Sequence, residues 1–201
     1  MVRLVEIEIP PEVLRQACGG DEAAQVVIYT ATAPATFALI RRLIANRAMA
    51  EDLFQETMMA LFQRLSEFRG EAPLGAWLRQ IAVSKCLMFL RSPWHRARLH
   101  LEGDGETTMA YGLGTLISPA PAAEGLDVEK ALATLSPTAR AIVWLYEVEG
   151  YSHEEIGRSF GRSVSFSKSQ LSRAHLKLRE WFEPSGGRQT CTSIQSNGKV
   201  L

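Results

Sequence analysis

The stretch that decides the fold reads SPTARAIVWLYEVEGYSHEEIGRSFGRSVSFSKSQLSRAHLKLRE and covers residues 136–180. It opens on Ser136, an N-cap residue, followed by a proline at the first helical position, where the missing N–H costs nothing. An apolar run then continues to Glu149, and Gly150 supplies the stop that a left-handed helix end favours. The first part of the stretch therefore predicts a helix over residues 137–149.

The second part of the stretch predicts two helices joined by a tight turn. Ser152 with Glu155 three residues later is a capping box, which opens a short helix to about Phe160. Gly161 permits a sharp turn, and Ser163 caps a longer helix that runs to about residue 181. Two helices with a short glycine-containing turn, the second longer and basic, are typical of a DNA-binding helix-turn-helix.

The longer helix has a basic outer face. No acidic residue lies between Ile156 and Arg179. A seven-residue repeat of Val164, Leu171 and Leu178 predicts the face toward the core. Lys and Arg bond guanine edges, and Ser bonds base edges or phosphate. The outward candidates are Ser165, Lys168, Ser169, Ser172 and Arg173. A helical hairpin with a solvated basic face is the alternative.

Upstream of this stretch the pattern is also helical, and no alternating strand pattern occurs. Asp21 is positioned to cap a helix that runs to about Thr32, and Pro34 interrupts or restarts it. The expected helices cover residues 21–32, 34–46, 50–68 and 73–91. The fold class predicted is all-α, with two small helical domains joined by a flexible acidic linker.

The net charge of zero conceals blocks of opposite sign. Residues 26–100 hold ten Lys or Arg against five Asp or Glu, and residues 130–182 hold eight against five. Residues 101–129 hold six acids and no base. Two basic blocks therefore flank an acidic connector, which bears on partners rather than on fold.

The first basic block carries two further candidate surfaces. On AEDLFQETMMALF, residues 50–62, polar side chains share one face opposite the apolar positions. In the next segment, Phe68 and Trp77 lie among Arg69, Arg79 and other cations. Rings that stack bases beside cations that meet phosphates are the requirements for binding single-stranded DNA. A solvated polar face and two core aromatics are the simpler alternatives.

Taken together, the two blocks resemble a bacterial RNA polymerase sigma factor of the extracytoplasmic-function (ECF) group of the sigma-70 family. AEDLFQETMMALF resembles region 2.2, which docks on the β′ coiled coil of the polymerase. FRGEAPLGAWLRQIA, residues 68–82, resembles the segment that melts and reads the minus-10 element. LATLSPTAR and the helices after it, residues 132–180, resemble region 4, which reads the minus-35 element.

The resemblance implies roles residue by residue. It implies β′ contacts for Asp52, Leu53, Gln55 and Glu56. It implies minus-10 recognition and melting for Phe68, Arg69, Trp77, Gln80 and Ser84. It implies minus-35 contacts for Arg162, Ser163, Ser165, Lys168, Ser169, Ser172 and Arg173. Val83, Ser84 and Met88 depart from the family pattern, as does the Phe166-Ser167 pair, so no promoter sequence is transferred.

The same resemblance sets domain boundaries and partners. Expected are an N-terminal extension over 1–22, a region 2 domain over 23–92, an acidic linker over 93–125, a region 4 domain over 126–182 and a polar, disordered tail over 183–201. The partners implied are core RNA polymerase through its β′ coiled coil and β flap, promoter DNA, and an anti-sigma factor.

Other classes of function have little support in the sequence. There is no P-loop, HExxH or nucleophile elbow, so no enzymatic activity, cofactor or metal is expected. Three cysteines without a CxxC pair argue against a disulfide framework, and a redox-sensing thiol stays open. No continuous apolar run approaches a membrane span, so a cytoplasmic protein without membrane insertion is expected. A helix-turn-helix regulator without sigma activity is the alternative function.

Overall fold

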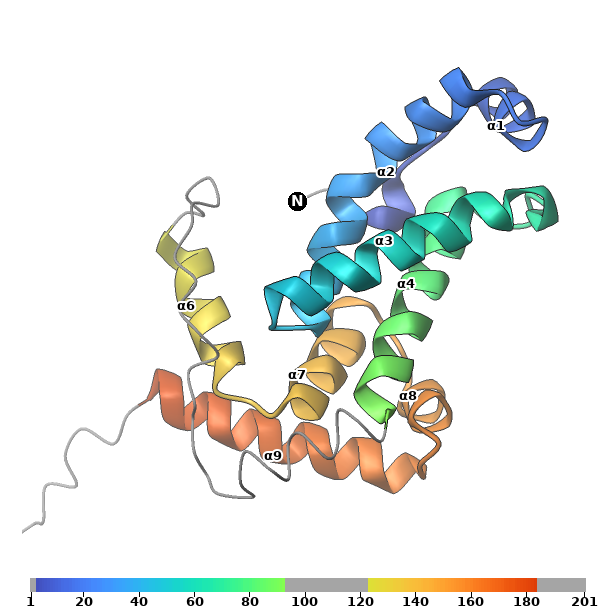
Figure 1. Cartoon of the computed structure of the whole chain (residues 1–201). Coiled ribbons are helices and arrows are strands. Elements are labelled where there is room, and N and C mark those ends of the chain that lie inside the picture. The colour runs from blue at the N-terminus through green and yellow to red at the C-terminus, as the bar shows by residue number, and fades with distance from the viewer. Residues whose placement is uncertain (1–2, 93–122, 184–201) are drawn as a thin grey trace, which may run out of the picture.

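The computed structural model describes residues 3–92 and 123–183, and every regular element in them is a helix. The expected acidic linker, apart from residues 123–125, and the tail from residue 184 lie outside the described residues. A first unit holds η1 (Leu4–Glu6), α1 (Pro11–Cys18), α2 (Glu22–Leu43), α3 (Arg47–Gln63), η2 (Leu65–Glu67) and α4 (Leu74–Arg91). A second unit holds α6 (Ala123–Ala133), α7 (Pro137–Val143), η3 (Trp144–Val148), α8 (His153–Phe160) and α9 (Val164–Phe182) (Figure 1). The all-α prediction is confirmed.

Helix α2 passes through Pro34 without a break, so the prediction of two separate helices is wrong. Proline lacks the backbone N–H that would donate one helical hydrogen bond, yet the packing of buried residues before and after Pro34 outweighs the loss of that bond. Thr32 and Thr36 are fully buried, and their hydroxyls donate to the carbonyls of Ile28 and Thr32 at 2.8 Å. Pro34 itself is exposed, so its ring meets solvent rather than a neighbouring helix.

Helix α3 ends at Gln63, five residues before the predicted end at Phe68. Arg64 leaves the helical region, with φ −110° and ψ 9°. Leu65 then turns into the core as the first residue of η2 and is only 1% exposed. Burial of this leucine decides where α3 ends, and the periodic pattern of apolar residues alone could not locate that end. By contrast, α4 covers the predicted residues almost completely, and Leu74, Leu78 and Ile81 are buried as expected.

Helix α2 is long and apolar enough to cross a membrane by length and composition, with a mean hydropathy of 1.5. The expectation concerned unbroken apolar runs, and this helix reaches that level with polar residues such as Thr30 and Thr36 among its apolar ones. A third of that window is buried, and the helix contacts α1, α3 and α4. In this fold α2 is therefore the central helix of the first unit.

The described part of the predicted N-terminal extension packs onto the first unit. Leu4 and Ala17 are buried against α2 and α4. Gly75 of α4 lies so close to this segment that a Cβ there would sit 1.8 Å from the Leu4 carbonyl oxygen. Only glycine allows that approach, so α4 and the N-terminal segment are fitted to each other.

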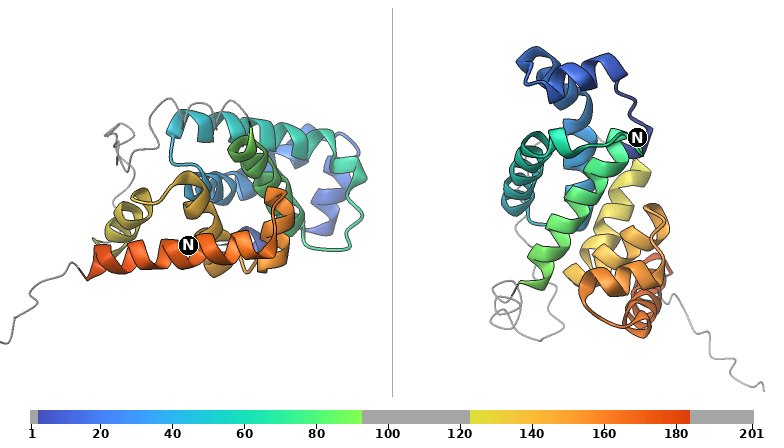
Figure 2. Two further views of the ribbon diagram at one scale, coloured as in Figure 1. Left: turned by 90° about the horizontal axis from the view of Figure 1, so that it is seen from below. Right: turned by 90° about the vertical axis from the view of Figure 1, so that its right-hand side faces the viewer.

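The two units share one hydrophobic core. Leu43 of α2 and Leu87 of α4 belong to the same buried cluster as Ile142 of α7 and Phe160 of α8. Helix α2 contacts α7, and α4 contacts α8. Figures 1 and 2 show α9 running beneath these helices, with α7 and α8 between it and the first unit. The candidate surfaces of both units are thus held in one arrangement.

Candidate nucleic-acid and polymerase interface

The helix-turn-helix forms as the local sequence predicts. The Ser152 hydroxyl oxygen accepts from the Glu155 N–H at 3.2 Å, and the Glu155 carboxylate accepts from the Ser152 N–H at 2.8 Å. The hydrogen bond from this backbone N–H, together with one from the hydroxyl, lowers the pKa of Glu155. Gly161 adopts φ 63°, and Ser163 accepts from the Phe166 N–H at 3.3 Å. The prediction of both caps and of the turn is confirmed.

The turn before α9 and the outward face of α9 carry the predicted minus-35 candidates. All seven are exposed, namely Arg162, Ser163, Ser165, Lys168, Ser169, Ser172 and Arg173. The inward face differs from the prediction, because Val164 is 40% exposed while Ser167 is fully buried. Val164 begins the helix at the edge of the core, whereas Ser167 lies under α8 and its hydroxyl is 3.0 Å from His153 Nδ1. The core face is therefore Ser167, Leu171 and Ala174.

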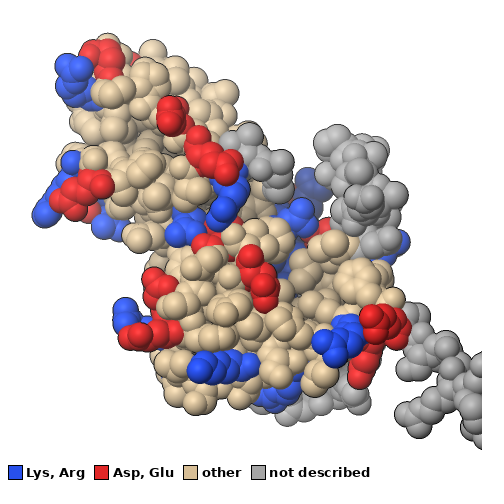
Figure 3. Space-filling view, turned by 180° about the vertical axis from the view of Figure 1, so that it is seen from behind, with Lys and Arg blue, Asp and Glu red and all other residues tan. Residues whose placement is uncertain are grey.

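The Lys and Arg residues of this face are exposed to solvent. Among the residues that the structure describes, no ion pair involves Arg162, Lys168, Arg173, Lys177 or Arg179. Arg173 Nε donates to the Ser169 carbonyl at 3.3 Å. In the middle of the lower edge of Figure 3 blue residues lie without red neighbours, whereas at its right-hand end blue and red residues lie side by side. Unpaired cations on one helix face are available for phosphates, which supply most of the affinity for DNA.

The outer face of α3 presents three of its four predicted residues. Asp52, Gln55 and Glu56 are exposed, together with Met59 at 60%. Leu53 is different: it is 6% exposed and lies in the core shared by both units. Its predicted role as a direct β′ contact is therefore wrong, because it is on the inward side of the helix. Glu56 is also bound to Lys85 of α4 at 3.0 Å.

The predicted minus-10 residues fall into two groups. Phe68 and Trp77 pack together at the start of α4, with ring centroids 5.4 Å apart and planes tilted by 45°. Both are half-buried, and the Arg64 guanidinium lies 5.9 Å from the Trp77 ring. Arg69 is exposed, 3.8 Å from Glu71. This end of α4 offers two partly open rings beside two cations.

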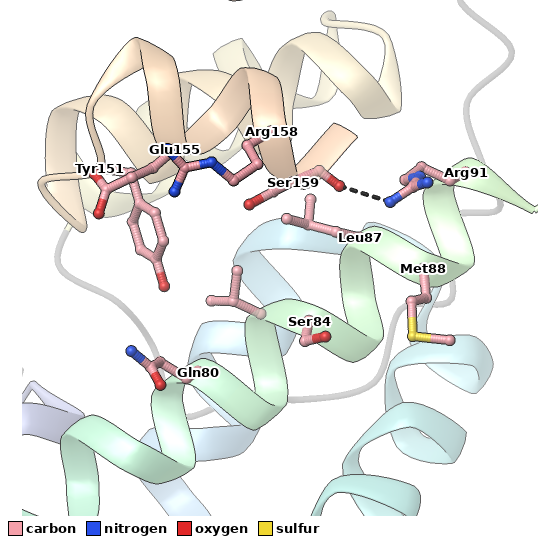
Figure 4. Close-up of a pocket in the computed structure, with 10 residues that line it drawn as sticks. Gln80, Ser84, Leu87, Met88, Arg91, Tyr151, Glu155, Arg158 and Ser159 are labelled. Carbon is pink, nitrogen blue, oxygen red and sulfur yellow. Dashed lines mark hydrogen bonds between the residues drawn. The ribbon is translucent and has the colours of Figure 1, made fainter. Parts of the chain in front are cut away.

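Gln80 and Ser84 lie farther along α4, where they face α8. They line a groove of about 390 Å³ between the two helices. Figure 4 shows Tyr151, Glu155, Arg158 and Ser159 from the second unit on its other side. The aromatic pair and the polar pair are thus not one continuous surface in this arrangement.

Sequence reasoning missed the residues that join the units. Arg79 Nη1 of α4 donates to the Glu149 carbonyl at 2.8 Å and lies 3.2 Å from the Glu149 carboxylate. Its guanidinium also lies 4.9 Å from the Tyr151 ring. Arg91 Nη1 donates to the Ser159 carbonyl at 2.9 Å. No sequence signal distinguishes these arginines from other surface cations.

Arg140 of α7 is the most buried of the joining residues, with 4% exposure. Its guanidinium donates to the carbonyls of Arg42 and Arg41 at 2.7 and 3.2 Å, capping the end of α2. It also lies 3.3 Å from the Glu129 carboxylate, which pairs with Arg42 as well. Burial, with Arg41 and Arg42 nearby, lowers the pKa of Arg140 to about 10. An arginine inside the apolar run TARAIVWL was the one available signal.

The cysteines and histidines give no sign of a metal site in the described part of the chain. No group of three or more potential ligands occurs there. Burial raises the pKa of Cys86 to about 12, which leaves its thiol unreactive at neutral pH. Cys18 is exposed and its Sγ lies 3.4 Å from the Leu65 carbonyl. Cys191 lies outside the described residues.

The fold and these surfaces define a helical protein whose second unit carries a helix-turn-helix with an exposed basic face. Comparison with known proteins places it more closely. Residues 28–96 match the family model "Sigma-70 region 2", and residues 125–178 match "Sigma-70, region 4". The chain therefore belongs to the sigma-70 family of RNA polymerase sigma factors, in its ECF group.

Individual relatives agree with this assignment. The chain is 30% identical over 172 residues to the probable RNA polymerase sigma factor RfaY of Xanthomonas campestris, covering 83% of this chain and 42% of that one. It is 30% identical over 171 residues to the ECF sigma factor SigE of Mycolicibacterium smegmatis, covering 81% and 64%. The chain thus spans less than two thirds of either relative.

A solved structure shares the fold. The sigma factor RpoE of Bartonella quintana, crystallised in complex with the anti-sigma factor NepR, is 28% identical. It superposes with a TM-score of 0.52, covering 77% of this chain and 93% of that one.

Proposed function

We propose that this protein is a sigma factor that directs core RNA polymerase to specific promoters and promotes strand opening. The observation that carries the proposal is the presence, in one chain, of two surfaces: a region 4 turn and helix whose five cations form no ion pair within the described residues, and a region 2 unit with an exposed acidic face. A plain helix-turn-helix regulator needs the first feature and has no use for the second. Polymerase supplies the catalysis, and the protein works in the cytoplasm.

In this mechanism the second unit binds the upstream element. Helix α9 enters the major groove, where Lys168 and Arg173 bond guanine edges and the exposed serines bond bases or phosphates. Arg162 and Ser163, at the turn, contact the backbone. Phosphate contacts hold the register and base contacts set promoter choice.

The first unit binds the polymerase and the opened strand. Asp52, Gln55 and Glu56 contact the β′ coiled coil, with Met59 adding apolar area at the same surface. Phe68 and Trp77 stack unpaired bases, and Arg69 meets phosphate. The β flap takes the second unit, and the acidic connector threads a basic channel of the polymerase. The structural relative with an anti-sigma factor supports a similar inhibitor for this chain.

Run-off transcription with purified core polymerase over a random promoter library tests the proposal. We expect RNA chains to start at defined positions only when this protein is present. Binding to DNA without such starts would instead support the alternative, a regulator without sigma activity.

The acidic face of α3 can be tested separately, because Glu51, the neighbour of Asp52, supplies a matched control. We expect Asp52→Ala with Gln55→Ala to weaken binding to core polymerase, since both side chains face outward. Each exposed polar contact contributes about 1 kcal/mol, so the loss is roughly tenfold or more. Glu51→Ala is the control, because Glu51 pairs with Arg47 on its own helix. Equal affinities for the double variant and the control would remove this face from the mechanism.

A further inference from the structure

A partly buried hydrogen bond joins the two helices of the helix-turn-helix. Ser167 lies on the core face of α9, one turn before Leu171, and none of its surface is exposed. Within the described residues its hydroxyl has one hydrogen-bond partner, His153 Nδ1 at the start of α8, at 3.0 Å. A hydroxyl both donates and accepts, so this bond can form with either tautomer of the imidazole. Without it, the chain would bury a polar group at a cost in free energy.

The His153 ring is itself held by a third element. It stacks on the ring of Tyr146, which belongs to the π-helical turn η3, with ring centroids 4.3 Å apart and planes inclined by 17°. The stack restricts where the imidazole lies, and the hydrogen bond restricts where Ser167 lies relative to the imidazole. Consecutive contacts therefore link η3 to α8 and α8 to α9.

Apolar residues make up the buried core between α8 and α9. Ile156 and Phe160 of α8 belong to the same buried cluster as Leu171 and Ala174 of α9. Apolar burial is non-directional, whereas a hydrogen bond weakens steeply as its geometry departs from the optimum. A satisfied polar pair in such a core selects one arrangement among several of similar apolar burial. Between these two helices, both within the described part of the chain, the bond that Ser167 makes is that directional contact.

The rotation of α9 about its own axis decides which side chains point away from the core. Lys168 directly follows Ser167, and Ser172 lies one turn beyond Lys168; both are exposed. Side chains keep fixed angles around a helix axis, so a rotation that moved Ser167 away from His153 would displace Lys168 and Ser172 as well.

We propose that His153 and Ser167 are positioning residues for base recognition, because their hydrogen bond fixes the rotation of α9 on α8. This inference rests on the proposed role of α9 in the major groove. Bonds to base edges require a defined geometry, whereas attraction between cations and phosphates tolerates small displacements of the helix. Loss of the pair therefore lowers selectivity among sequences more than it lowers overall affinity for DNA.

Conservative substitutions test the pair without emptying the core. Ser167→Ala removes the hydroxyl and keeps a small side chain that favours helix. His153→Phe keeps a ring that can stack on Tyr146 and removes Nδ1. His153→Asn, the conservative variant, retains a side-chain amide that can bond the Ser167 hydroxyl. Thr134→Ala is the matched control, since it removes a half-buried hydroxyl of the same unit that donates to the nearby Ala131 carbonyl at 2.7 Å.

Each full-length variant is assembled with core polymerase and tested on duplexes randomised over the upstream element. Selectivity is the affinity for the duplex that wild type binds best, divided by the affinity for a scrambled duplex. We expect Ser167→Ala and His153→Phe each to lower this ratio roughly three- to tenfold, the equivalent of one net hydrogen bond, with affinity for the scrambled duplex within about twofold of wild type. The double variant loses no more than either single variant, because the two residues act as a unit. His153→Asn recovers most of the ratio, and Thr134→Ala keeps it.

A measurement without DNA separates this inference from the proposed function. His153→Phe should move the amide NMR resonances of Lys168 and Ser172 on α9, and Thr134→Ala should leave them in place. Unmoved resonances, wild-type selectivity in both single variants, or losses that add in the double variant overturn the proposal. If wild type prefers no duplex, base recognition by α9 is overturned and this proposal with it, and the resonances then show separately whether the pair positions the helix.

Discussion

The two units are both basic by composition but present different surfaces. In the first unit the cations from Arg41 to Arg91 are engaged by acids, by backbone carbonyls or by the second unit. In α9 the cations carry no acidic partner within the described residues. In the upper part of Figure 3, over the first unit, red and blue residues lie next to each other.

The number of Lys and Arg residues in a unit therefore does not give the number that are available to bind phosphates. The proposed duplex binding by the second unit needs no rearrangement, because the cations of α9, which form no ion pair within the described residues, already face solvent. The proposed strand binding by the first unit requires ion pairs to be exchanged for phosphates. Variants at the junction between the units, on the exposed face of α9 and at the capping box of α8 test this difference.

The largest expected effect is at Arg140, where the two units meet. Arg140→Met removes the guanidinium that caps α2 and leaves two carbonyls and part of Glu129 without their partner. We expect a loss of about 3 kcal/mol in the free energy of unfolding, as for the loss of one member of a buried ionic network. Urea unfolding measures it.

A surface arginine of the same unit supplies the control. Arg158 is 73% exposed in its pair with Glu154, so Arg158→Met should stay within about 0.5 kcal/mol of wild type. Similar losses for the two variants would mean that Arg140 does not join the units energetically.

The next largest effect is expected on the exposed basic face of α9. Arg173→Ala should reduce promoter selectivity at one upstream position by about 1–3 kcal/mol, if its side chain bonds a base edge. Arg179→Ala, two turns farther along α9, should weaken binding evenly across sequences and lower the salt dependence of binding. Competition binding with a set of single-base variants of the upstream element distinguishes the two patterns. A uniform loss for Arg173→Ala would assign it to phosphate.

The smallest effect concerns the capping box that begins α8. The folded pKa of Glu155 lies below its ordinary value, so its stabilising contribution is present above about pH 4.5 and is lost as pH falls through the folded pKa. Glu155→Gln keeps an oxygen that can accept from the Ser152 N–H and removes the titration. We expect wild type to lose more of its thermal stability than the variant between pH 6 and 3, measured by circular dichroism. Parallel losses would assign the acid sensitivity to other groups.

Much of the second unit was predictable because its signals are local. Ser136, Ser152, Ser163 and Gly161 act on backbone groups within three or four residues, so the sequence carries the whole interaction. The π-helical turn η3, within the helix expected to reach Glu149, carries no such signal.

The first unit was predicted less well, because long-range burial decides its details. Pro34 marks a break by local rules, yet the buried face of α2 maintains the helix through it. Leu65 ends α3 by entering the core, and Leu53 turns inward among residues from both units. None of these outcomes depends on neighbours in sequence.

By itself the sequence determined the helical class, the helix-turn-helix and the face of α9 that carries free cations, because periodicity and capping are set within a few residues. Only the tertiary structure decided which cations are already engaged, that Gln80 and Ser84 face α8, and that Arg140 caps α2. The contacts of Arg79 with Glu149 and of Arg140 with the end of α2 join residues 70 to 99 positions apart, and a guanidinium chooses its partner by distance and burial in the folded chain.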